Sequence, residues 1–286
     1  MDHEKIFLTL FVLISVLSVN RAFSQTTPGE IFQKGLEAYY GARFADGIKY
    51  FDDYIKIMPN EINGFKYRGL CYQGKKDFQR AIEDFSSVIR MSPNKAEGYV
   101  NRGNTYIMMN NLPSAERDFK DAVKNESHNI EGYIGLSRIS IAKNDFNGAE
   151  KQLSSAIAVD PQNARLFIAQ AYVNFLAGDT VKIIDNFAQA MYWDSSVVFT
   201  DHNRELLQIK VESYKKALNI ADQKIQKNKN SYMSYFSRGM IYFFMNNYKS
   251  ARSDFKKAQE LYTGNDKKLE NLFALVIRSV DRNSNK

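Results

Sequence analysis

The sequence predicts an all-α fold, an α-solenoid of seven 34-residue helix-turn-helix repeats with a C-terminal capping helix. Three observations support this prediction. Residue types recur at a spacing of 34, so that Gly69 is followed by Gly103 and, four periods later, by Gly239. Small residues recur at two places in each repeat and would let paired helices approach closely. An amphipathic segment follows the last repeat, where such an array needs a helix to cover its final apolar face.

Residues 1–24 are predicted to be a cleaved signal peptide, followed by a short leader at 25–27. Ile6 to Val19 is a run of about 14 apolar or small residues, shorter than the ~20 that a membrane-spanning helix needs. Ala22 and Ser24 are small residues of the kind that signal peptidase requires, so we expect cleavage after Ser24. The alternative is an uncleaved signal that anchors the protein in the inner membrane.

The repeats are expected to fill residues 28–265 without an insertion. They begin at Pro28, Ile62, Ala96, Ile130, Ala164, Val198 and Tyr232. The first helix carries a small residue at one shared place: Gly35, Gly69, Gly103, Ser137, Ala171 and Gly239. A large residue of the second helix is expected to fill the space beside it: Phe51, Phe85, Phe119, Leu153, Phe187 and Phe255. The repeat from Val198 has Glu205 at the small place, so we expect it to pack poorly.

The segment 62–95 carries landmarks that occur together in one known repeat: Gly69, Tyr72, Phe78, Ala81, Phe85 and Pro93. With these landmarks and the 34-residue period, the segment resembles the tetratricopeptide repeat, and the resemblance extends over residues 28–265. It implies a superhelix whose concave groove is lined by first helices. It also implies a non-catalytic scaffold whose ligand depends on the groove residues.

An arginine of the first helix recurs with an aspartate of the second in three repeats: Arg68 with Asp84, Arg102 with Asp118, and Arg238 with Asp254. The resemblance places these positions on facing helices, so we expect an ion pair within each of these repeats. The alternative is two independently solvated charges.

Residues 266–280 are predicted to form the capping helix, with a frayed tail at 281–286. The pattern places apolar residues on one side of this helix: Leu269, Leu272, Phe273, Val276, Ile277 and Val280.

The resemblance also implies which residues line the groove. Its middle zone would be polar and suited to an extended peptide backbone, with Lys66, Gln73, Asn101, Asn104, Ile107, Ile134, Arg138 and Ile141. Its C-terminal zone would be apolar, with Ile168, Tyr172, Phe175, His202, Leu206, Ile209, Phe236, Met240 and Phe243. The candidate partner-binding residues are Tyr172, Phe175, Leu206, Phe236, Met240, Phe243, Asn101, Asn104 and Lys66. The apolar residues could form a hydrophobic groove or pack between helices, and the sequence leaves both alternatives open.

A carboxylate clamp, which some members of this family use to hold a peptide C-terminus, is not expected. Lys66 and Asn101 match two clamp positions, but Leu70, Glu131 and Gly135 occupy the other three.

The sequence contains no grouping typical of an enzyme, a metal site or a cofactor site. His3, His128 and His202 are far apart and match no ligand spacing. The single cysteine, Cys71, lies in an amphipathic pattern and is expected to be a small buried hydrophobe. We therefore expect no catalytic residue, no metal and no cofactor.

Positive charge is concentrated near the C-terminal end. Residues 28–197 hold 20 Lys and Arg against 21 Asp and Glu, whereas residues 198–265 hold 12 against 6. The leading interpretation is a periplasmic or secreted scaffold that binds a protein or peptide in its groove, in envelope assembly or secretion. Nucleic acid is not expected as a partner, and membranes only by association. The alternative is a binder of an anionic polymer or polysaccharide through lysines of the basic region: Lys215, Lys216, Lys224, Lys227 and Lys229.

Overall fold

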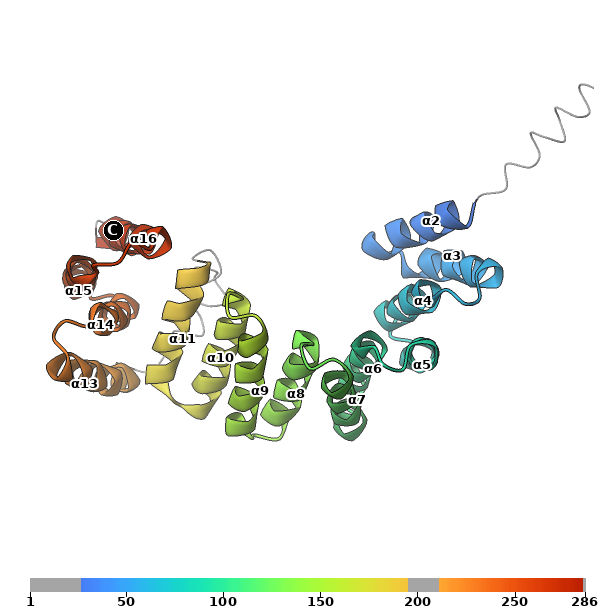
Figure 1. Ribbon diagram of the computed structural model, residues 1–286, viewed down its shortest axis with the longest axis horizontal. Helices are drawn as coiled ribbons and strands as arrows, with labels where there is room; N and C mark the ends of the chain where they lie inside the picture. Colours follow the sequence, from blue (N-terminus) through green and yellow to red (C-terminus); the bar gives the residue numbers. More distant parts are fainter. Residues whose placement is uncertain (1–26, 195–210, 285–286) are drawn as a thin grey trace, which may run out of the picture. The chain divides into compact units, whose positions relative to one another are not determined.

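The computed structural model of the chain describes residues 27–194 and 211–284. The regular elements of these residues are all helices, shown in Figure 1. They are α2 (Pro28–Tyr40), α3 (Phe44–Ile57), α4 (Ile62–Gly74), α5 (Phe78–Met91), α6 (Ala96–Met108), α7 (Leu112–Asn125), α8 (Ile130–Ala142), α9 (Phe146–Val159), α10 (Ala164–Ala177), α11 (Thr180–Trp193), α13 (Val211–Lys227), α14 (Tyr232–Phe244), α15 (Tyr248–Leu261) and α16 (Lys267–Ser284). The predicted all-α repeat fold is confirmed.

The turn inside a repeat has a recurring local structure. Its key residue has a positive φ, and this residue recurs in step with the repeats: Ala42, Lys76, Asn110, Asn144, Gly178 and Asn246. The next residue is Asp or Asn in five of these turns, and its side chain accepts a hydrogen bond from a backbone N–H of the second helix, as Asp145 Oδ1 does from Gly148 N at 2.9 Å. The turn therefore both reverses the chain and caps the helix that follows.

The chain divides into two compact units, one up to Asp118 and one from Phe119 onward, and α7 spans the boundary. In the N-terminal unit, second-helix phenylalanines pack onto first-helix glycines. Phe85 is fully buried, and a Cβ atom added to Gly69 would lie only 2.8 Å from its ring. In the same way, a Cβ atom on Gly47 would lie 2.7 Å from Cys71 Sγ. These contacts leave no room for larger side chains at the two glycines.

The C-terminal unit ends in α16, which packs on α15 and on α11. Its apolar side is buried, as expected for a capping helix: Leu269, Leu272, Phe273, Val276 and Val280. The expected frayed tail is wrong for residues 281–284, which continue the helix. Asp281 holds this last turn by accepting a hydrogen bond from Arg252 Nε at 2.6 Å.

Helix α11 has neighbours that the regular repeat does not give it. Elsewhere a second helix packs on the first helix of the next repeat, as α3 does on α4 and α9 does on α10. Among the described helices, α11 contacts α13, α14 and α16 as well as α10. The last repeat and the cap therefore fold back onto α11, and this contact decides which side chains of α14 reach the surface.

Of the described helices, none combines the length and apolar character needed to span a membrane. The predicted signal peptide at 1–24 and most of the first helix of the repeat from Val198 lie outside the described residues.

Candidate functional site

In the N-terminal unit, two of the predicted groove residues are engaged within the protein. Lys66 Nζ lies 3.0 Å from Glu97 Oε1 and 4.7 Å from the centre of the Tyr67 ring, and its side chain is only 15% exposed. Gln73 Nε2 donates to Thr105 Oγ1 at 3.0 Å. Lys66 and Gln73 therefore link neighbouring first helices and present little free hydrogen-bonding capacity to a ligand.

Asn101 and Asn104 differ from these two residues. Both lie half-buried on α6, three residues apart and therefore on one face of the helix. Among the described residues, neither side-chain amide has a hydrogen-bond partner. Because each amide can donate and accept, the pair is suited to the backbone of an extended peptide.

In the C-terminal unit, Tyr172 and Phe175 stand out on α10. Their exposed fractions are 40% and 38%, and their spacing of three residues places them on one face. Arg138, at an equivalent place on α8, is also exposed. Ile134 and Ile141 of α8 pack instead against a small core cluster of Ala149, Leu153 and Val173. The exposed surface of α8 and α10 therefore carries two aromatic rings and a cation, and aliphatic residues of the same two helices pack in the core beneath it.

The prediction that Phe236 and Met240 line the groove is wrong. Each is 2% exposed, because α14 packs against α11 and the Phe236 ring lies 5.9 Å from the ring of Phe273 in the cap. Phe243 is half-buried and lies edge-on to Phe244 and Tyr248, at ring distances of 5.7 and 5.8 Å. Leu206, His202 and Ile209 lie outside the described residues. The apolar zone is thus a binding candidate on α10 and part of the core on α14.

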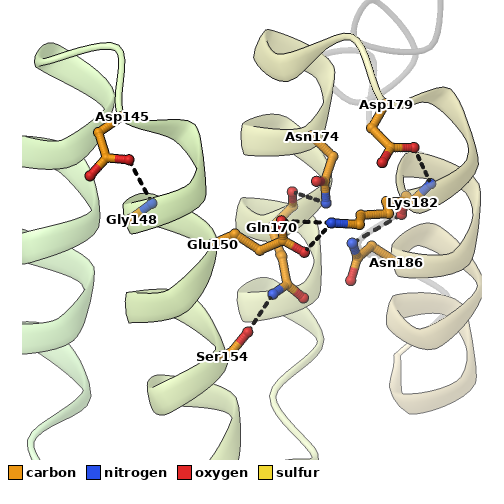
Figure 2. A network of polar contacts seen from close by, with 9 residues as sticks. All are labelled: Asp145, Gly148, Glu150, Ser154, Gln170, Asn174, Asp179, Lys182 and Asn186. Carbon is orange, nitrogen blue, oxygen red and sulfur yellow. Dashed lines mark hydrogen bonds and ion pairs between the residues drawn. The ribbon is translucent and has the colours of Figure 1, made fainter.

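A polar network links α9, α10 and α11 (Figure 2). Lys182 Nζ of α11 lies 2.9 Å from both carboxylate oxygens of Glu150 on α9, and this hydrogen bonding raises the pKa of Lys182 above its usual range. Gln170 of α10 donates to Ser154 Oγ at 2.9 Å, and the amide of buried Asn174 donates to the Gln170 carbonyl at 2.9 Å. The network links the three helices by contacts that the sequence pattern did not reveal.

The predicted Arg–Asp pairs are present as two-pronged ion pairs. Arg102 Nε and Nη2 each lie 2.8 Å from a carboxylate oxygen of Asp118, and Asp118 is 2% exposed. The Arg68–Asp84 and Arg238–Asp254 pairs have the same geometry. Hydrogen bonding to Asp118 and Asp254 raises the pKa values of Arg102 and Arg238 above the usual arginine range. The independently solvated alternative is therefore wrong.

Each of these arginines also has a second partner on the preceding helix. Arg68 Nη1 donates to Asp52 at 2.8 Å, Arg102 Nη1 to Ser86 at 2.9 Å, and Arg238 Nη1 to Asp222 at 2.7 Å. In this way one guanidinium joins three successive helices, which fixes the register between neighbouring repeats.

Two further features bear on chemistry. Cys71 is fully buried, and this burial raises the pKa of its thiol to about 12, so the thiol stays protonated at neutral pH. Among the described residues, no group of His, Cys, Asp and Glu is placed to hold a metal ion.

The lysines of α13 are mostly exposed. Lys215, Lys216 and Lys227 lie opposite the buried side of the helix, which carries Tyr214, Ala217, Ala221 and Ile225. Lys229 follows the helix and is exposed as well. Lys224 is engaged with Asp185 of α11 at 3.3 Å.

Comparison with known proteins identifies the repeat. Residues 68–95 and 234–265 match a family model described as tetratricopeptide repeat. No curated protein matches the chain in sequence.

Solved structures of similar fold come from several organisms. A tetratricopeptide repeat protein from Parabacteroides merdae is 15% identical, with a TM-score of 0.51 over 87% of this chain and 98% of that one. Yeast Tom70 is 16% identical, with a TM-score of 0.53 over 95% of this chain and 58% of its own. A MamA structure from Desulfovibrio magneticus is 14% identical, with a TM-score of 0.50 over 59% of this chain and 96% of that one. At these identities the similarity concerns the fold.

Proposed function

The chain is a tetratricopeptide repeat protein, and we propose that it is a non-catalytic scaffold that binds a protein or peptide on the face formed by α8 and α10. Tetratricopeptide repeats generally mediate protein–protein interaction, and such scaffolds generally carry no catalytic groups of their own. In the proposal, Tyr172 and Phe175 are the anchors and Arg138 supplies a charge beside them.

The observation that carries this proposal is the exposure of two aromatic rings on one helix face. At the matching places of α14, Met240 is 2% exposed and Phe243 is half-buried, whereas Tyr172 and Phe175 remain 40% and 38% exposed. Aromatic residues held on a rigid support are typical hot spots of protein interfaces. The network of Figure 2 contributes to that support, because Gln170 of α10 donates to Ser154 of α9 and Lys182 of α11 pairs with Glu150 of α9.

The test is quantitative capture from an extract of the host cell envelope. We expect Tyr172→Ala and Phe175→Ala to keep the melting temperature of the parent. Each should weaken binding of the captured partner by ~2 kcal/mol or more, roughly thirtyfold in Kd. Tyr40→Ala is the matched control, because Tyr40 is 74% exposed on α2 in the other unit. If capture survives both α10 variants, or is lost equally with the control, the proposed face is not the binding site.

We also propose that the protein acts in the periplasm or outside the cell, in an envelope assembly or secretion process. The support is the apolar run of Ile6 to Val19 followed by Ala22 and Ser24. N-terminal sequencing of the protein from its host should begin at Gln25. A protein that begins at Met1 and fractionates with the inner membrane would favour the anchored alternative.

A second candidate function is binding of an anionic polymer or polysaccharide. It is favoured by the exposed Lys215, Lys216, Lys227 and Lys229, none of which has an ion-pair partner among the described residues. Lys216 and Lys227 are eleven residues apart, about three helical turns, and so share one face. Binding through these lysines should weaken steeply as salt rises, whereas binding to the aromatic face should change little.

A further inference from the structure

A cavity of ≈ 230 Å³ lies in the C-terminal unit, where α11, α14 and α16 meet. Aromatic rings make up much of its wall, together with aliphatic side chains of the cap. The principal lining residues are Tyr192, Tyr232, Phe236, Tyr262, Asp266 and Leu272. A dry cavity of about 150 Å³ is large enough to bind benzene, so this one has room for a small organic molecule.

The position of the cavity follows from the packing of the last repeat onto α11. The rings of Tyr232 and Tyr262 lie edge to face at 5.2 Å, and the Tyr262 ring lies 6.0 Å from Phe273 of the cap. Tyr262 Oη accepts a hydrogen bond from Asp266 N at 2.9 Å, which fixes the ring relative to the start of α16. The aromatic wall is therefore assembled from residues that are far apart in the chain and held by direct contacts.

Asp266 gives the cavity its charge. It is the only charged side chain among the described residues that line the cavity. One oxygen accepts hydrogen bonds from Lys268 N at 2.8 Å and Leu269 N at 3.4 Å, and the other accepts from the hydroxyl of Tyr192. A carboxylate has about four acceptor positions, so one remains for a ligand. These hydrogen bonds also hold the pKa of Asp266 below its usual value, the Tyr192 bond first among them, which keeps the group ionised.

We propose that this cavity is a binding site for a small organic ammonium ion. Aromatic faces attract cations through their quadrupoles, and cages of aromatic rings are a known means of binding quaternary ammonium groups. The carboxylate of Asp266 adds a full negative charge on the same wall. An anion would face both the ring faces and this carboxylate, and a neutral molecule would gain from neither. The same chemistry is offered by a free amine and by the methylated lysine side chain of a partner protein.

The protein contains its own reporter of this site. Its single tryptophan, Trp193, follows Tyr192 directly, and the two ring centres are 4.7 Å apart. The Lys268 ammonium lies 5.0 Å from the centre of the Trp193 ring, so the start of the cap contacts the reporter as well. A ligand that enters the cavity should therefore change the fluorescence of the full-length protein.

The test compares choline with 3,3-dimethylbutan-1-ol, the neutral molecule of the same shape in which carbon replaces nitrogen. We expect choline to change Trp193 fluorescence in a saturable manner, and the neutral alcohol to bind at least about tenfold more weakly in calorimetry. Equal binding of the two probes, or no saturable binding of choline, would overturn the proposal. A third measurement uses acetylated trimethyl-lysine methylamide to distinguish a free amine from a lysine side chain of a partner protein. Tighter binding of this probe than of choline points to the protein side chain.

Two variants locate the site. Asp266→Asn keeps a side-chain oxygen to cap α16, removes the charge, and replaces the acceptor of the Tyr192 hydroxyl by an amide that can donate to it. This variant should fold normally and lose the preference for choline. Tyr232→Leu removes one aromatic ring from the cavity wall and should weaken choline binding by about tenfold. The matched control is Asp281→Asn, which removes a half-exposed carboxylate from the other end of the same helix and should bind choline as the parent does. If choline binding is unchanged in Asp266→Asn and in Tyr232→Leu, the cavity is not the site.

Discussion

At the level of single residues, one arginine side chain connects three successive helices in each of three repeats. These arginines are Arg68, Arg102 and Arg238. The partner sixteen residues downstream is always aspartate, and it was therefore visible as a recurring pair in the sequence. The partner sixteen residues upstream is Asp52, Ser86 or Asp222, so the residue type there is not constant. Sequence periodicity reveals a contact only when the residue type is constant. The ion pairs with the following helix could therefore be predicted, and the contacts with the preceding helix could not.

Replacement of the aspartate that pairs with each arginine should lower the unfolding free energy by different amounts in different repeats. In Asp118→Asn, Arg102 keeps only the neutral Ser86 as its second partner, whereas in Asp84→Asn, Arg68 keeps the carboxylate of Asp52. We expect Asp118→Asn to cost about 2 to 3 kcal/mol of unfolding free energy, less than the ~3 to 5 of a fully buried pair because Arg102 is 22% exposed. Asp84→Asn should cost about half as much.

The control for this pair is Asp53→Asn, which removes an exposed partner of Lys56 and should change stability by less than about 1 kcal/mol. Urea unfolding of the three variants supplies the comparison. Equal costs for the two buried acids would show that the upstream partner contributes nothing.

The single thiol gives a pH prediction. Cys71 has a pKa of about 12 in the folded protein against 9.0 ordinarily, so the folded state holds the proton more tightly. Its contribution to stability is complete below pH 9.0 and is lost as the pH rises toward about 12. Iodoacetamide at pH 9 should therefore modify the folded protein far more slowly than the protein in urea, as mass spectrometry can measure. Equal rates would place the thiol at the surface.

The exposed and buried phenylalanines of the predicted groove should respond differently to truncation. Phe236→Ala should cost on the order of 3 to 5 kcal/mol, because Phe236 is 2% exposed in the core of the C-terminal unit. Phe175→Ala should leave the melting temperature nearly unchanged, because Phe175 is 38% exposed. A stable Phe236→Ala variant would mean that α14 does not pack on α11 and α16 in solution.

At the level of elements, the helices and the cap could be predicted, and the neighbours of α11 could not. The 34-residue pattern records contacts inside a repeat and between consecutive repeats, because those contacts recur. The contacts of α11 with α14 and α16 occur once. No repeated pattern records them, and the groove assignment of Phe236 and Met240 failed for that reason. Tyr172, at the place on α10 that matches Met240, is 40% exposed.

The cap should stabilise the whole C-terminal unit. Truncation after Asn265 removes the buried Leu272, Phe273 and Val276 together with the hydrogen bond between Tyr192 and Asp266. We expect a lower melting temperature and concentration-dependent association on gel filtration, because the apolar faces of α15 and α11 become exposed. Arg278→Ala, a change on the exposed side of the same helix, should behave like the parent. A truncated protein that melts and elutes like the parent would show that the cap is dispensable.

At the level of the whole molecule, two compact units present different surfaces. The N-terminal unit offers the amides of Asn101 and Asn104, and the C-terminal unit offers the aromatic pair of α10 and an exposed row of lysines on α13. The repeat pattern could predict which helix faces to examine. It could not predict which side chains on those faces are already engaged, because Lys66 with Glu97 and Gln73 with Thr105 are individual pairs rather than repeated ones.

Site-specific photo-crosslinking can detect a protein partner that binds on the proposed face of α8 and α10. A benzophenone amino acid at position 175 in the full-length protein, irradiated in the living host, should crosslink to one defined partner. The same amino acid at position 40 or 236 should give no such product, since Tyr40 is exposed elsewhere and Phe236 is buried. A partner that crosslinks equally well from position 40, or no crosslink from position 175, would show that this face is not the binding site.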